Sequence, residues 1–563
     1  MSGRTARVCT ALALGVVLAA AGCTGHRLAH AYPLGSQSGG PPRPGGRAVF
    51  VREGDQDYID PALSYELYSS PVVMGVNRML LDYVNEPGVA GTRRVPGLAT
   101  SLPTITDDGT LYAFRVRPDA RFAQPIGRHI VAADFKYALE RLFRVGSPGV
   151  DFFRHIVGAA NVLAGRDTAL AGVIARGDSL YIRLERPDPV FLSVLSMTFA
   201  APLPREAVPA VSGAFPTTIA SGPFRIAEFS PRQRVVLVKN PDYCGSPAWL
   251  DTVEVRFGVT TSNGVAMIRR GAADGGLFEV PAAEYGRLRN DPSWRPQLDV
   301  ADGLNTTFMF MNVRMKPFND VRVRQAVAWA VDRRIAVKTY SGKASIAGEV
   351  LPPSMPGSLQ LGRYPGPDLA RARRLLAEAG YPHGFSTMLY AGTEEPWPRL
   401  VTVIQQELAE IGIRATLDFS EFSTYFAMIG DTTRHVPFGM FGWYADYPDP
   451  SNFFDTLLNG HRITAIHNNN NSMFDDATVN AMIERAMVTR DDSSRVRLWQ
   501  DVDRSVMDEV PMVPMVHALE SRLYAPRLGG WYRHLTCVLK LESLYIKSDA
   551  PGAVAGSHAE QPR

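Results

Sequence analysis

The apolar and polar positions of the chain change period repeatedly, which predicts strands and helices mixed along its length. Tyr112, Phe114 and Val116 alternate with polar neighbours, as in a half-buried strand, whereas the apolar residues of 135–143 recur at helical spacing. The pattern therefore predicts an α/β protein. Turns that contain Gly or Pro separate further strand-like segments, which cover 46–54, 179–189, 221–229 and 233–243.

The pattern becomes more regular after about residue 319. A helix is predicted over 319–340, with Asn319 or Asp320 as its N-cap. A second helix is predicted over 368–380, because an Asp stands at its start and a Gly at its end.

A strand, a helix and a strand then follow one another at 386–392, 398–412 and 413–419. A crossover of this length makes the two strands parallel neighbours. A short helix over 423–430 leads into a further strand over 436–446.

The stretch "GWYADYPDPSNFF", residues 442–454, is expected at the carboxyl end of this last strand. Ligands of open α/β sheets collect at such strand ends. An acid placed there, Asp446, is therefore a candidate for ligand binding, although it could instead cap the turn before Pro448.

Composition indicates more than one lobe and argues against a nucleic-acid partner. The chain has 563 residues, of which 45% are hydrophobic, and this exceeds the length at which one core usually splits. Lys and Arg number 59 against 56 for Asp and Glu, and a net charge of +3 is too small to neutralise a phosphate backbone.

The first 23 residues are predicted to be an export signal. Arg4 and Arg7 precede the apolar run 11–21, which is too short for an ordinary membrane span. The end of this run, "LAAAGC", resembles a bacterial lipoprotein signal, in which Cys23 would become the lipidated first residue. It departs from that pattern at Ala20, where Leu is commoner, and the alternative is ordinary secretory cleavage with Cys23 incidental.

The signal sets the expected location. Residues 24–46 are rich in Gly, Pro and Ser and are predicted to be a flexible tether, and 548–563 a disordered tail. We therefore expect a cell-envelope protein, either lipid-anchored at the outer face of the cytoplasmic membrane or free in the periplasm.

The residues give no sign of a metal centre, a cofactor or catalysis. The sequence has no G-x-S-x-G, no P-loop motif and no H-E-x-x-H, so it is predicted not to be an enzyme. Cys244 and Cys537 could form one disulfide in an oxidising compartment, and "HNNNN" at 467–471 indicates a polar turn.

Three stretches carry a resemblance to a known family. They are "IDPALSYELYSSPVVMGVNRMLLDYV" from residue 59, "PGLATSLPTITDDGTLYAFRVRPDARF" from residue 96, and "GWYADYPDPSNFF". In this order they resemble the solute-binding proteins of bacterial ABC importers that carry dipeptides and oligopeptides, family 5. The resemblance covers 47–547 and departs at 124–127, where the family often has Asp-Gly.

The resemblance implies a two-lobed periplasmic-binding-protein fold, the "Venus flytrap" of the large peptide binders. Lobe I would comprise 47–305 with 516–547 and contain an extra subdomain at about 90–220, and lobe II would comprise 306–515. Such a protein would be a monomer that closes on a short peptide and delivers it to a membrane permease with its ATPase subunits. The alternatives are another cargo, such as a nickel chelate, a sugar or haem, or a lipoprotein that senses peptides without transport.

The resemblance also implies the site. Asp446 matches the acid that pairs with the α-ammonium group of the ligand, and Gly442, Trp443 and Tyr444 stand in the same motif. The relatives' basic residue three positions before the Trp is Met440 here, so capture of the ligand carboxylate cannot be carried over. The weaker candidates for the cleft are Tyr65, Glu66, Leu67 and Phe152, and for the carboxylate Arg434 and His435.

Overall fold

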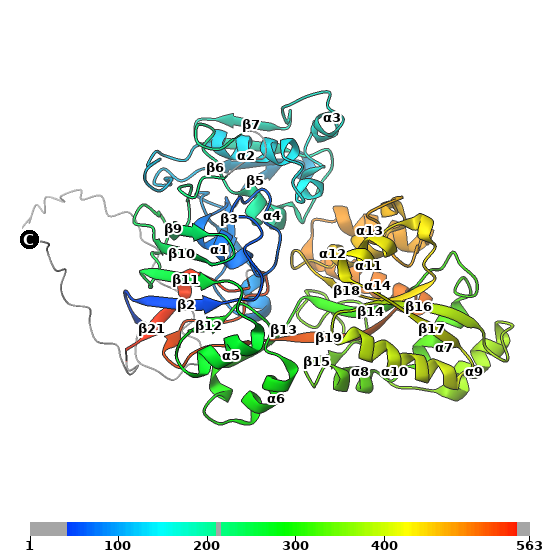
Figure 1. Cartoon of the computed structure of the whole chain (residues 1–563). Coiled ribbons are helices and arrows are strands. Elements are labelled where there is room, and N and C mark those ends of the chain that lie inside the picture. Colours follow the sequence, from blue (N-terminus) through cyan, green and yellow to red (C-terminus); the bar gives the residue numbers. More distant parts are fainter. Residues whose placement is uncertain (1–41, 210–214, 537, 549–563) are drawn as a thin grey trace, which may run out of the picture.

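The computed structural model describes residues 42–209, 215–536 and 538–548, which form two lobes joined by extended strands (Figure 1). The first lobe contains residues 42–302 and the C-terminal end of the described chain, and the second lobe contains the segment between them. The predicted signal with Cys23, the tail from residue 549, and Cys537 lie outside the described residues.

The described chain begins with a short strand rather than with the tether expected up to residue 46. β1 (Pro42–Arg43) pairs antiparallel with β21 (Tyr545–Lys547), so the two ends of the described chain lie side by side. β21 also pairs with β20 (Leu528–Gly529).

The main sheet of the first lobe has five strands and confirms the strands predicted around 46–54, 221–229 and 233–243. β2 lies between two parallel neighbours, and the far side of the sheet is antiparallel. Its apolar face packs against α1 and against the returning C-terminal segment. In sheet order the strands are β12 (Gly275–Gly276), β2 (Arg47–Val51), β11 (Thr252–Arg256), β10 (Arg234–Lys239) and β9 (Phe224–Ser230).

A second, four-stranded antiparallel sheet has its own hydrophobic core in the first lobe. The predicted helical period at 135–143 is confirmed by α2, whose apolar face packs on this sheet. The strands in order are β5 (Thr104–Thr106), β6 (Leu111–Arg115), β8 (Ser179–Arg183) and β7 (Val173–Arg176), and β3 (Leu81–Tyr83) pairs separately with β4 (Arg94–Pro96). The helices of this lobe are α1 (Ser70–Val76), α2 (Ala132–Arg144), α3 (Ala159–Leu163), α4 (Phe191–Val194), α5 (Thr261–Arg269) and α6 (Ala282–Asn290).

The second lobe is built on a mixed sheet of seven strands, which extends along β19 to β13 of the first lobe. β16 and β17 are parallel neighbours joined through α10, as predicted, and β18 runs parallel to β16. The carboxyl ends of these three strands therefore share one edge of the sheet. In sheet order the strands are β13 (Leu298–Asp302), β19 (Met512–Leu523), β14 (Asn305–Met311), β18 (Phe438–Tyr444), β16 (Ser386–Gly392) and β17 (Arg414–Ser420), with β15 (Ala344–Ile346) beside β19.

The helix predicted over 319–340 is two helices. Asp320 caps the first by accepting a hydrogen bond from the backbone N–H of Arg322, but Val331 is extended, and Asp332 caps a new helix through Arg334. A second capping residue inside the periodic run ends the first helix. The helices of this lobe are α7 (Val321–Ala330), α8 (Arg333–Thr339), α9 (Leu369–Glu378), α10 (Trp397–Glu410), α11 (Phe422–Ile429), α12 (Ser451–Leu458), α13 (Ala477–Val488) and α14 (Asp492–Glu509).

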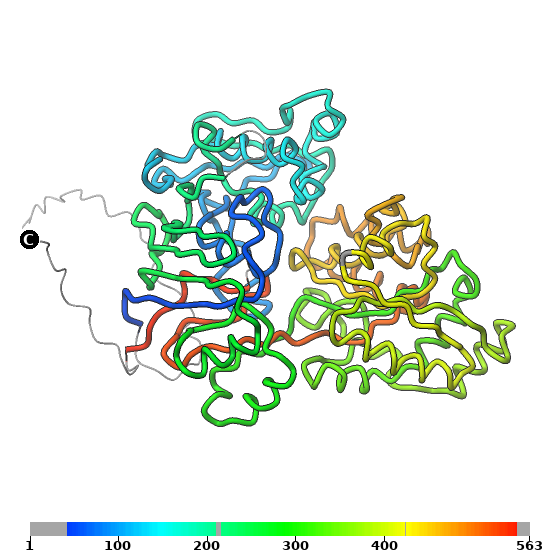
Figure 2. The backbone as a smooth tube through the Cα atoms, viewed as in Figure 1, coloured from blue at the N-terminus to red at the C-terminus, as the bar shows by residue number. Residues whose placement is uncertain are grey.

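The lobes are connected twice, at 303–304 and through β19. The first residues of β19 pair with β14 in the second lobe, and its last five residues, Leu519 to Leu523, pair with β13. Figure 2 shows this strand running from one lobe to the other. Within the described ranges no helix is both long and apolar enough to cross a membrane.

Candidate functional site

Two adjacent cavities lie between the lobes. The smaller, of about 300 Å³, is named here the Asp446 cavity, and the larger, of about 450 Å³, the Lys343 cavity. Leu67 of the first lobe and Tyr444 of the second line both of them, so the cavities adjoin at this pair. A ligand that passes Tyr444 can therefore occupy both.

Asp446 follows the end of β18 and contacts both lobes. The Tyr65 hydroxyl, from the first lobe, donates a hydrogen bond to one carboxylate oxygen, and the side-chain amide of Asn452 donates to the other at 3.0 Å. The Asn452 carbonyl in turn accepts from the Asp446 backbone N–H at 3.1 Å and from the Trp443 indole at 2.9 Å. Asn452, on α12, therefore fixes the orientation of the carboxylate.

The Asp446 carboxylate has neutral hydrogen-bond donors and no ion pair within the described part of the chain. Burial raises the pKa of this carboxyl above its ordinary value, and the hydrogen bonds from Tyr65 and Asn452 offset only part of that rise. Burial and the nearby Asp446 charge also raise the pKa of Tyr65. A cation brought into this cavity would therefore meet an acid whose charge is not yet balanced.

Aromatic rings from both lobes gather beside Asp446. The Tyr65 ring lies 5.8 Å from that of Phe199 and 6.5 Å from that of Phe152. Phe152 also meets Tyr447 of the second lobe, edge to face, at 6.4 Å. Phe152 thus lies behind Tyr65 and Phe199, which line the cavity itself.

The Lys343 cavity has charged walls. The Lys343 ammonium donates to the Val280 carbonyl at 2.7 Å and lies 3.9 Å from Glu279. Burial lowers the pKa of Lys343. On the other wall, the Tyr444 hydroxyl donates to Glu520 and accepts from Arg533 at 2.8 Å, which couples the end of β18 to the strand that joins the lobes.

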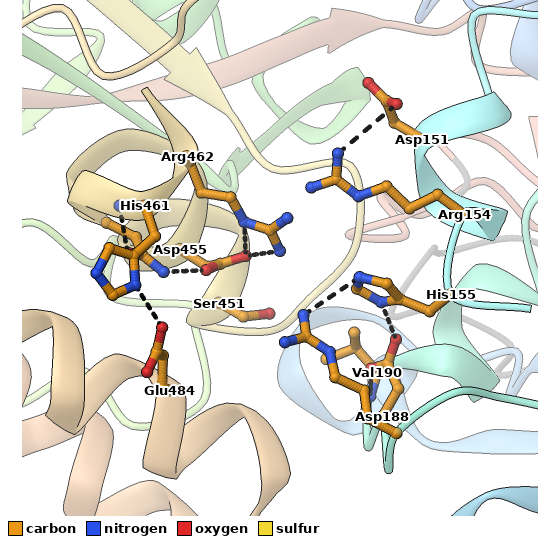
Figure 3. A network of polar contacts seen from close by, with 12 residues as sticks. Asp151, Arg154, His155, Asp188, Val190, Ser451, Asp455, His461, Arg462 and Glu484 are labelled. Carbon is orange, nitrogen blue, oxygen red and sulfur yellow. Dashed lines mark hydrogen bonds and ion pairs between the residues drawn. The ribbon is translucent and has the colours of Figure 1, made fainter. Parts of the chain in front are cut away.

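Charged side chains also face one another across the gap, near α12 (Figure 3). Asp455 accepts from Arg462 at 2.9 Å on one side, while Arg154 and His155 project from the other. Burial raises the pKa of Asp455, and the positive charges of Arg186, Arg154 and His155 oppose that rise. Each lobe thus carries charges of both signs at this point, Asp455 with Arg462 on the second lobe and Asp151 with Arg154 on the first.

The structure brings five of the ten ligand-binding candidates from the sequence to the interlobe gap, and Phe152 packs beside one of them. Tyr65, Glu66, Leu67, Tyr444 and Asp446 line the Asp446 cavity.

The remaining candidates lie elsewhere. Trp443 packs against the core of the second lobe, and Gly442 pairs with Thr307 inside the sheet. Arg434 and His435 lie before the opposite end of β18, where Arg434 is exposed and paired with Asp431 at 3.5 Å. These two are not among the residues that line either cavity.

Several contributing residues were missed from the sequence. Asn452 could have been predicted, because it stands six positions after Asp446 in the same motif. Lys343, Glu279 and the segment 196–199 carry no local pattern that marks them. Among the described residues, no three His, Cys, Asp or Glu side chains are grouped so as to hold a metal ion.

Comparison with known proteins places this geometry in a family. The family model described as Bacterial extracellular solute-binding proteins, family 5 Middle, matches residues 93–464. The chain is 26% identical over 456 residues to Heme-binding protein A of Haemophilus influenzae, covering 77% of this chain and 81% of that protein. It is 27% identical over 498 residues to the Dipeptide-binding protein of Escherichia coli, covering 84% and 89%.

Solved structures of similar proteins support the same assignment. The chain matches Clavulanic acid biosynthesis oligopeptide binding protein 2 with a TM-score of 0.84 and 25% identity, over 92% of this chain and 98% of that one. It matches the periplasmic binding protein DppA from Helicobacter pylori, in complex with peptide STSA, with a TM-score of 0.72 and 25% identity, over 90% and 99%. The predicted two-lobed fold is thereby confirmed, and this protein belongs to the bacterial extracellular solute-binding proteins of family 5.

Proposed function

We propose that this extracytoplasmic protein captures short peptides between its lobes and delivers them to the permease of an ABC importer. The observation that carries the proposal is the half-buried Asp446 carboxylate, which lines an interlobe cavity and is held only by neutral donors in the described structure. The α-ammonium group of a peptide supplies the cation that this acid lacks. A charge-assisted hydrogen bond in a water-poor cleft is stronger than the same contact in bulk water.

The rest of the ligand does not need a fixed sequence. Peptide main chains can be held by hydrogen bonds that ignore side-chain identity, and bridging waters satisfy different polar groups at modest cost. Relatives whose names state dipeptide or oligopeptide binding support this assignment. A relative named for haem is the main rival, but an ammonium anchor gives no specific contact to a haem.

The contribution of the ligand amine to binding can be tested directly. Peptides with a free N-terminus should bind about 10- to 100-fold more tightly than their N-acetylated versions, because a hydrogen bond to a charged group contributes about 1.5–3 kcal/mol. Isothermal titration calorimetry on matched peptide pairs measures the ratio. Equal affinities would show that Asp446 does not hold the amine.

The same samples test the motion of the lobes. On this proposal, 47–305 with 516–547 and 306–515 move as two bodies, about a hinge formed by 303–305 and β19. Small-angle scattering should give a smaller radius of gyration with the free peptide than with its acetylated control.

We further infer that a monomer of this protein is tethered to the cytoplasmic membrane by lipid on Cys23, which lies outside the described residues. The support is the sequence order of apolar signal, "AAGC" and a Gly- and Pro-rich segment. Replacing Cys23 by Ser should release the protein into the soluble fraction and lower peptide uptake, while leaving the affinity of the purified protein unchanged. A Cys23→Ser protein that is correctly cleaved and still found in the membrane fraction would contradict lipid anchoring.

A further inference from the structure

An exposed group of aromatic rings on the second lobe is not explained by the anchor at Asp446. Phe422 and Phe426 stand one turn apart on α11 and are 42% and 39% exposed. Their rings are stacked, with centroids 6.1 Å apart and planes 7° apart. A contiguous exposed apolar patch can mark a surface that binds a ligand or a partner.

One buried ring and one partly buried ring hold this pair in place. Phe426 stacks on Phe441 of β18 at 5.8 Å, and Phe422 meets Trp397 at 6.4 Å. Trp397 also lies 6.4 Å from Phe441, so the four rings are mutually supported. We call Trp397, Phe422, Phe426 and Phe441 the aromatic shelf.

The shelf continues the wall of the Lys343 cavity. Glu395 and Pro396, the two residues just before Trp397, line that cavity. The backbone N–H of Phe422 donates to Glu394 at 3.0 Å, next to Glu395 in the same wall. α10 and α11 both begin at the carboxyl ends of parallel strands, which puts their first residues at one edge of the sheet.

We propose that the aromatic shelf binds an aromatic or large apolar side chain of the peptide, so that the protein prefers peptides carrying such a residue after the first position. This inference rests on the proposed function, because it assumes that Asp446 holds the peptide amine. A peptide anchored there passes Tyr444 into the Lys343 cavity, whose wall leads to the shelf. Stacking on the shelf then removes apolar surface of both partners from water.

The test is calorimetry with tri- and tetra-alanine and with versions in which the second, third or fourth residue is Phe. Phe at one of these positions should raise the affinity about tenfold over Ala, since a ring contact adds to the area that is buried. In the double variant Phe422→Ala, Phe426→Ala the ratio should fall to about one, with the affinity for the all-Ala peptides changing less than about threefold.

Val488→Ala is the matched control, because Val488 is an exposed apolar residue, 43% accessible, at the end of α13. It should keep the preference for Phe. Thermal unfolding of each variant checks folding, and half-exposed rings can be truncated with little loss of core packing.

The outcomes separate the two proposals. Equal affinities for Ala and Phe peptides, or a preference that survives in the double variant, would overturn the role of the shelf and leave the anchor at Asp446 intact. Both proposals would be overturned if no free-amine peptide binds, while a porphyrin binds to the wild-type protein and not to the double variant. Loss of the preference only in the double variant supports the shelf.

Discussion

Replacing Asp446 by Asn should weaken the binding of free-amine peptides by about 10- to 100-fold, because the ligand ammonium loses a charged partner worth about 1.5–3 kcal/mol. The affinity for N-acetylated peptides should change far less, since they bring no cation to the cavity. A double cycle of Asp446→Asn against acetylation, measured by calorimetry, isolates the ammonium–carboxylate contact.

The pH dependence of peptide affinity should become weaker with the same substitution. Burial raises the pKa of Asp446, so in the wild-type protein the carboxylate takes up a proton earlier than an ordinary acid as the pH falls. Affinity for a free-amine peptide should therefore decrease toward acid pH in the wild type and stay flatter in the variant. Glu410→Gln removes one negative charge at the exposed far end of α10 and should leave both the affinity and its pH profile unchanged.

The unfolding midpoint without peptide shows whether Asp446→Asn still folds. The variant replaces one oxygen that accepts a hydrogen bond from Tyr65 or Asn452, but it also removes a half-buried charge that has no ionic partner in the described structure. The midpoint should therefore move little. A folded variant that binds free-amine peptides as tightly as the wild type would remove Asp446 from the site.

Replacing Asp503 by Asn should stabilise the second lobe at neutral and alkaline pH. Asp503 lies on α14 with 1% of its surface exposed. Burial and then the negative charge of Glu349 raise its pKa to about 8, although the backbone amides of Val350 and Leu351 and the charge of Arg504 oppose that rise. One carboxylate oxygen accepts from the Val350 backbone N–H at 3.3 Å, and the other has no hydrogen-bond partner in the described structure. Ionising this group inside the fold is therefore unfavourable.

The direction in which stability changes with pH follows from proton linkage. The folded protein holds the Asp503 proton up to about pH 8, whereas an unfolded chain releases it near pH 4. Between these values stability falls as the pH rises, by at most about 1.4 kcal/mol per pH unit, and it levels off above pH 8. Asp503→Asn removes this loss, so its advantage should be near zero at pH 4 and roughly 2–4 kcal/mol at pH 7.5.

Chemical denaturation at several pH values measures the effect. Asp501→Asn is the control, because Asp501 is two positions away on the same helix but is exposed and paired with Arg504 at 2.7 Å. It should change stability by less than about 1 kcal/mol at every pH. An advantage of Asp503→Asn that is the same at pH 4 and pH 7.5 would show that Asp503 does not keep its proton in the folded state.

Local sequence patterns were enough to predict the local elements and one part of the site. Period and capping residues located α2, the parallel pair β16 and β17, and β18 with Asp446 at its end, because these depend on neighbours within a few positions. The same reasoning joined α7 and α8 into one helix, since apolar spacing alone does not show that Asp332 caps a second helix. Motif spacing then identified the family, although it assigned no partner to the ligand carboxylate.

The surroundings of Asp446 are set by the tertiary fold. Tyr65 reaches it from 381 positions away, and Lys343 meets Val280 across the gap between the lobes. The aromatic shelf likewise joins Trp397 and Phe422, at the starts of two helices, through Phe426 to Phe441 in the middle of a strand. Such contacts depend on the order of strands in the sheet and on the two crossings between lobes, and neither of these is set by the chemistry of neighbouring residues along the chain.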